Sequence, residues 1–100
     1  MYRGTTPRID IKVRGMDLTG AKTFVTLKQG PVEITKVDIP CESTDDGCKL
    51  TVTLTQQETL RYKAHTAFIQ MRWLTADGKA YASPAKAISL KEILKQGVIE

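Results

Sequence analysis

The stretch "HTAFIQMRWLTADGKAYAS", residues 65–83, is the most informative about the fold, because it joins a long alternating run to a turn dipeptide. One set of alternating side chains in it is entirely apolar and consists of Ala67, Ile69, Met71 and Trp73. A period of two is typical of a β-strand with one buried face. The Asp77-Gly78 pair that follows predicts a two-residue type I′ turn, which needs positive φ at both central residues. The stretch therefore predicts a β-hairpin with Trp73 in the core.

Most of the remaining chain alternates in the same way. "PRIDIKVRG" (residues 7–15) and "CKLTVTLT" (residues 48–55) each place apolar side chains on one side and polar ones on the other. "KTFVTLKQGPVEITKV" predicts two strands, about Lys22–Lys28 and Val32–Val37. The turn between them falls at Gln29-Gly30-Pro31, because proline lacks the N–H that a strand ladder uses. "KAYAS" and "AKAISL" predict two more short strands after the Asp-Gly turn.

Helical signals are confined to two short segments. In "TQQETL", Thr55 followed three residues later by Glu58 fits a capping box and predicts one helical turn between two strands. Near the end, Leu90, Ile93 and Leu94 have helical spacing, and Gly97 is placed to stop a short terminal turn.

These elements predict the fold class. Seven or eight short strands with one or two helical turns indicate an all-β antiparallel sandwich with immunoglobulin-like or jelly-roll-like connectivity. The length of 100 residues fits one domain over residues 1–100, large enough to bury a core. The strand connectivity itself stays open at the level of sequence.

The charge distribution does not favour nucleic acid as a partner. The formal net charge is +4, but the basic residues are scattered and alternate with apolar ones instead of forming a run. A nucleic-acid binder is expected to gather them on one face or helix. No apolar run approaches the ~20 residues of a membrane span, and the first residues lack the apolar centre of a signal peptide. We therefore expect synthesis in the cytoplasm and no membrane insertion.

The residues that usually carry metal or catalytic chemistry form no motif. His65, Cys41 and Cys48 are too few and too dispersed for a zinc site. "STDDG" lacks the regular ligand spacing of a calcium loop, so a solvated turn is the better interpretation. His65 has no nucleophile or acid near it in a motif. We expect no catalytic residue, no metal and no cofactor.

The two cysteines leave a disulfide open. A two-residue turn at Asp46-Gly47 would place Cys48 opposite Asp45 and Cys41 opposite Val52, so the sulfurs would not meet. A six-residue loop would place the two cysteines opposite each other and permit a bridge. Synthesis in the cytoplasm favours free thiols.

The long strand also offers a face for recognition. Phe68, Arg72 and Leu74 share the side opposite Trp73, and the expected type I′ turn places Leu74 opposite Tyr81. Aromatic residues and arginine are enriched at protein interfaces. Phe68, Arg72, Leu74 and Tyr81 are therefore candidate protein-interaction residues, with coverage by a loop or the terminal segment as the alternative.

Several segments together resemble a known family. "YRGTTPRIDIKV", "TFVTLKQG", "LTVTLTQQETL", "MRWLTADGKAYAS" and "LKEIL" occur here in an order and spacing similar to the N-terminal domain of phage baseplate upper proteins and related short prophage proteins of Gram-positive bacteria. The resemblance covers about residues 2–99. It implies a β-sandwich and a structural role without catalysis, in which the domain docks to neighbouring tail or baseplate proteins. It also implies a place in the virion after synthesis in the host cytoplasm.

Two functional hypotheses follow. The first is a non-enzymatic structural or adaptor module of a phage or prophage tail, with other tail proteins as partners and a homo-oligomer as one form of assembly. The second is a carbohydrate-binding module that contacts the host cell wall, with Trp73, Tyr81 or Tyr62 stacking on sugar rings.

Overall fold

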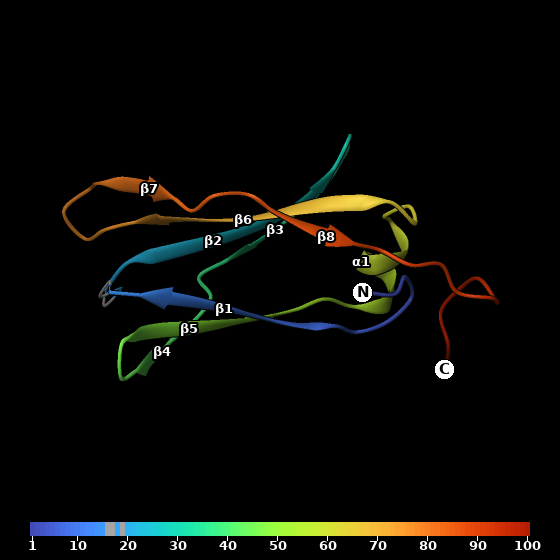
Figure 1. Cartoon of the computed structure of the whole chain (residues 1–100), viewed down its shortest axis with the longest axis horizontal. Coiled ribbons are helices and arrows are strands. Elements are labelled where there is room, and N and C mark those ends of the chain that lie inside the picture. The colour runs from blue at the N-terminus through green and yellow to red at the C-terminus, as the bar shows by residue number, and fades with distance from the viewer. Residues whose placement is uncertain (16–17, 19) are drawn as a thin grey trace.

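The computed structural model describes residues 1–15, 18 and 20–100 and is built from two antiparallel β-sheets. Figure 1 shows one sheet above the other with their strands running along the long axis, and a short helix at the end where both chain termini lie. The Cα trace extends over 46 × 26 × 19 Å. This arrangement is the all-β, sandwich-like fold that the alternating sequence predicts.

The smaller sheet has three strands in the order β1-β5-β4. Its strands are β1 (Arg8–Arg14), β4 (Cys41–Thr44) and β5 (Gly47–Thr53). Among the described residues, β1 and β4 each pair only with β5 and are therefore the two edges of this sheet.

The larger sheet has five strands, and β6 lies at its centre. Its strands are β2 (Lys22–Gln29), β3 (Val32–Val37), β6 (Thr66–Leu74), β7 (Ala80–Ala82) and β8 (Lys86–Ser89). β2 pairs with β3 on one side and with β6 on the other. The side of β6 away from β2 pairs with two strands: β8 pairs with residues 66–69 and β7 pairs with residues 72–74.

The core lies between the sheets and consists of the side chains that the alternation places inward. In β6, the four predicted core residues from Ala67 to Trp73 are all buried, and their alternating neighbours are not. β5 contributes Leu50 and Val52 from the opposite sheet. Burying one face of each sheet against the other removes apolar surface from water, which is the main favourable term in folding.

The helix α1 (Gln56–Leu60) carries the chain from one sheet to the other and begins as predicted. The Thr55 hydroxyl accepts a hydrogen bond from the N–H of Glu58, and the Glu58 carboxylate accepts one from the N–H of Thr55. Lys36 Nζ lies 2.6 Å from the Glu58 carboxylate. Burial alone would raise the pKa of Glu58, but the hydrogen bonds from Lys36 and Thr55 outweigh it and lower the pKa below its usual value.

The prediction of a helical turn near the end of the chain was wrong. Residues 90–97 form no helix, and Leu94 is fully exposed. The N–H of Lys91 instead donates to the carbonyl of Met1, and the N–H of Arg3 donates to the carbonyl of Lys91. Pairing with the N-terminal residues uses the backbone groups that a helix would need, so tertiary contacts override the local spacing.

The hairpin between β4 and β5 corrects the expectation of free thiols. Its turn lies at Asp45-Asp46, one residue earlier than an Asp46-Gly47 turn, so Ser43 pairs with Cys48 and Cys41 pairs with Leu50. The cysteines are diagonal neighbours on one face of the sheet, with Cα atoms 5.9 Å apart. This spacing suits a disulfide, and the structure joins the two sulfurs.

Candidate interaction surfaces

The first candidate surface is the outer face of the larger sheet, which carries three of the four predicted interaction residues. Phe68, Arg72 and Leu74 project from β6 on the side away from the core, and all three are exposed. We call these three residues the outer patch. Phe68 is 51 % exposed and Leu74 is 41 % exposed, which is unusual for large apolar side chains on one strand.

Neighbouring strands extend the outer patch. Arg72 pairs across the sheet with Phe24 of β2, and Phe24 in turn pairs with Val37 of β3, which is 48 % exposed. Lys22 Nζ lies 5.8 Å from the centre of the Phe24 ring, in cation–π contact. An apolar stripe with two cations therefore crosses three strands of the larger sheet.

Tyr81 does not belong to this face, contrary to the prediction. Leu74 pairs with Ala80, so Tyr81 pairs with Trp73 and the two rings stack with centroids 5.6 Å apart. The reason is the turn, which has one residue more than a type I′ turn. Thr75 pairs with Lys79, and in this turn only Gly78 has a positive φ, at 89°. Tyr81 stays 44 % exposed but faces the side of the sheet that carries the core.

The second candidate surface is a groove between the two sheets, with a cavity of about 440 Å³. Its lining comes from β1, β6, β8 and the link before β8, and includes Ile9, Ile11, Met71, Pro84, Lys86 and Ile88. We call it the edge groove. Its size is within the ~300–1,000 Å³ range of ligand pockets. The sequence did not predict this groove, because β1 and β8 are far apart in the chain and only the tertiary fold brings them together.

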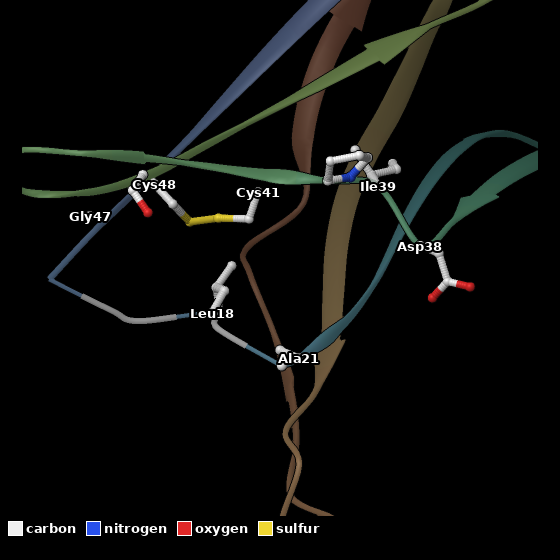
Figure 2. Close-up of a pocket in the computed structure, with 10 residues that line it drawn as sticks. Leu18, Ala21, Asp38, Ile39, Cys41, Gly47 and Cys48 are labelled. Atoms are coloured by element: carbon white, nitrogen blue, oxygen red, sulfur yellow. A yellow bond between two sulfur atoms is a disulfide. The ribbon is translucent and has the colours of Figure 1, made fainter.

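A third hollow of about 360 Å³ lies beside the disulfide. Figure 2 shows Leu18 facing the Cys41–Cys48 bridge, with Ile39 alongside, whereas the Asp38 carboxylate points away from it. The lining also includes Ser43, and no hydrogen bond joins its hydroxyl to the Asp38 carboxylate among the described residues.

His65 and Tyr62, two titratable residues considered for function, lie in different surroundings. His65 is exposed at the start of β6. The ring of Tyr62 is completely buried, its hydroxyl donates to the carbonyl of Leu27 at 2.5 Å, and burial raises its pKa. Within residues 1–15, 18 and 20–100, no group of three His, Cys, Asp or Glu side chains could hold a metal ion.

Two of the three rings considered for sugar stacking are inside the protein. Trp73 is 8 % exposed and Tyr62 is fully buried, so only Tyr81 presents ring surface to solvent. The Tyr81 ring lies nearly parallel to Trp73, with 18° between the planes, so one of its faces is already occupied. One face of one ring is a small platform for a carbohydrate.

Among the described residues, no helix has the length and apolar character needed to span a bilayer. Comparisons with protein-family models, with curated proteins and with solved structures found no match to this chain.

Proposed function

We propose that this chain is a non-enzymatic docking module of a phage or prophage tail baseplate, which binds neighbouring tail proteins through the outer patch. The biological setting comes from the resemblance of the sequence segments described above. The observation that carries the docking role is the exposure of Phe68, Arg72 and Leu74 on one face of the sheet. Aromatic residues and arginine are enriched at protein interfaces, and an exposed apolar patch marks an interaction site.

The geometry of the outer patch suits a protein partner better than a small ligand. Phe68 stands on the open face of the sheet, and Arg72 and Leu74 border a hollow of about 210 Å³, which is smaller than the ~300–1,000 Å³ of usual ligand sites. An exposed apolar stripe of this kind is buried more completely by a protein surface than by a small molecule. Placement in a baseplate, assembly with other copies and location in the virion are parts of the same proposal.

A carbohydrate-binding role receives less support. The hypothesis assigned sugar stacking to Trp73, Tyr81 or Tyr62, and of these three only Tyr81 is exposed. We therefore advance the docking module as the single proposed function.

Removal of this chain from a phage or prophage that encodes it tests the biological setting. We expect tail particles without a complete baseplate when they are viewed by electron microscopy. Particles with intact baseplates would contradict the proposal.

A double variant tests the outer patch itself. Phe68→Ser with Leu74→Ser should lower the fraction of the chain bound to tail particles by about ten-fold, because two apolar contacts are lost at the centre of the interface. The control is Leu94→Ser, which removes a fully exposed leucine of the C-terminal segment that is not part of the outer patch. Circular dichroism of both variants should match the native protein. Equal loss in the control would show that general surface hydrophobicity, not the outer patch, governs binding.

A further inference from the structure

The strand β1 presents a free edge over its whole length. β1 has seven residues and pairs only with β5, so its backbone groups on the other side have no strand partner in the described part of the chain. A long unpaired edge is a template for another strand. The side chains of β1 alternate regularly, with Ile9 and Ile11 half-buried and Asp10 and Lys12 exposed.

This free edge borders the edge groove because the facing edge of the larger sheet is interrupted. Neither β7 nor β8 pairs with Met71, and Ser83, which lies in the link between these two strands, bonds to Met71 instead. The N–H of Met71 donates to Ser83 Oγ at 3.0 Å, and the N–H of Ser83 donates to the carbonyl of Met71 at 2.8 Å. Pro84 follows and has no backbone N–H with which to continue the pairing. Apolar side chains of both sheets line the open space at this point.

The groove carries positive charge on both walls. Lys12 lies on the β1 wall and Lys86 on the β8 wall. Among the described residues, neither lysine forms an ion pair. The one acid of the lining, Asp10, is already paired with Arg8 at 3.4 Å and accepts a hydrogen bond from the Thr51 hydroxyl at 3.0 Å. The hydrogen bond from Thr51 holds the pKa of Asp10 below its usual value.

We propose that the edge groove binds an extended segment of another protein as a fourth strand beside β1. In this segment apolar residues would alternate with acidic ones. The apolar side chains would fill the groove against Ile11 and Ile88, which lie on the core side of their strands, and the acidic side chains would lie on the other face of the segment, beside Lys12. Backbone hydrogen bonds to the edge supply affinity in such strand addition, and the alternate side chains supply specificity.

A second copy of this chain is a poorer occupant on charge grounds. The exposed positions of β1 hold Arg8, Lys12 and Arg14 against a single acid, Asp10. Two such edges placed side by side would bring like charges together, and like charges opposite each other destabilise a strand pair. The proposal therefore commits to an acidic partner strand. It goes beyond docking by the outer patch, uses a different side of the molecule and does not depend on the phage setting.

The pure full-length chain is sufficient to test the proposal. The probe is a short synthetic peptide in which valine alternates with glutamate, and the control peptide replaces glutamate with lysine. Titration of the ¹⁵N-labelled chain should give saturable chemical-shift changes along Arg8–Arg14 and at Ile88 with the acidic peptide only. Hydrogen exchange of β1 amides that point away from β5 should slow in the complex.

A charge exchange tests the assigned lysine. Lys12→Glu should weaken binding of the acidic peptide by about five-fold and should strengthen binding of the basic peptide, because one cross-strand charge pair changes sign. The matched control is Lys28→Glu, an exposed lysine on the outer face of the larger sheet. It alters the net charge equally and should leave both affinities unchanged.

Three results would overturn the proposal. The first is the absence of saturable binding by the acidic peptide. The second is a set of shifts centred on Phe68 and Leu74, which would place the peptide on the outer patch. The third is concentration-dependent change along β1 without peptide, which would make a second copy the occupant.

Discussion

Two hairpins of this protein contain the same dipeptide, Asp-Gly, and use its glycine in different ways. In the β6–β7 hairpin, Gly78 lies in the turn with φ 89°, and a β-carbon added there would meet no atom within 4 Å. In the β4–β5 hairpin, Gly47 is the first residue of a strand and pairs with Arg14 of β1. One glycine serves the local turn, and the other serves the approach of a neighbouring strand.

The two hairpins show that an Asp-Gly pair indicates a local preference for a turn but does not indicate which residues form that turn. A β-carbon on Gly47 would overlap the carbonyl oxygen of Val13, because the end of β1 crosses closely over this position. Asp45-Asp46 consequently forms the turn, and the registers of both cysteines change with it. Two substitutions and one chemical treatment test this difference between the two hairpins.

The largest effect is expected for Gly47→Ala. The added methyl group must displace the backbone of β1, so the free energy of unfolding should fall by about 3 kcal/mol, at the upper end of overpacking costs. Denaturant unfolding followed by circular dichroism measures it. A loss no larger than that of Gly78→Ala would remove the distinction between the two glycines.

An intermediate effect is expected on reduction of the Cys41–Cys48 disulfide. The bridge closes a short loop with a sequence separation of 7, so its loss should lower the free energy of unfolding by about 2 kcal/mol. Hydrogen exchange should accelerate in β4 and β5 but not in β6 and β7. The double variant Cys41→Ala, Cys48→Ala is the control and should not respond to reductant. Unchanged exchange in the native chain would show that the bridge does not brace this hairpin.

The smallest effect is expected for Gly78→Ala. The position is open but requires a left-handed backbone, which costs an L-residue about 1 kcal/mol. Gly78→Asn should cost less, because asparagine adopts this conformation more readily. Thermal unfolding of the pair measures the difference. If alanine and asparagine behaved alike, the left-handed backbone would not be the source of the cost.

Much of the fold was predictable from residues whose local and tertiary preferences agree. Ile9, Ile11 and Val13 alternate in the sequence and face the core in the structure. The capping box at Thr55 and Glu58 forms as the pattern predicts, because its partners are only three residues apart. Interactions of this range depend little on the remainder of the chain.

The candidate surfaces were predictable only in part. Phe68, Arg72 and Leu74 share a face because they lie on one strand, and this follows from a period of two. Tyr81 was misplaced because one extra turn residue transfers it to the other face. The edge groove could not be foreseen, because it combines Lys12 and Lys86, which come from strands of different sheets.

The alternation of residues and the capping box were enough to predict most strands, the helix cap at Thr55 and the apolar and polar face of each strand, because these depend on neighbours within a few positions. The turn registers, the Cys41–Cys48 disulfide and the non-helical path of residues 90–97 followed only from the arrangement of the whole chain. Each of these depends on where a distant strand lies. A β-sheet forms its contacts between residues far apart in the chain, and a shift of one residue changes which face a side chain occupies.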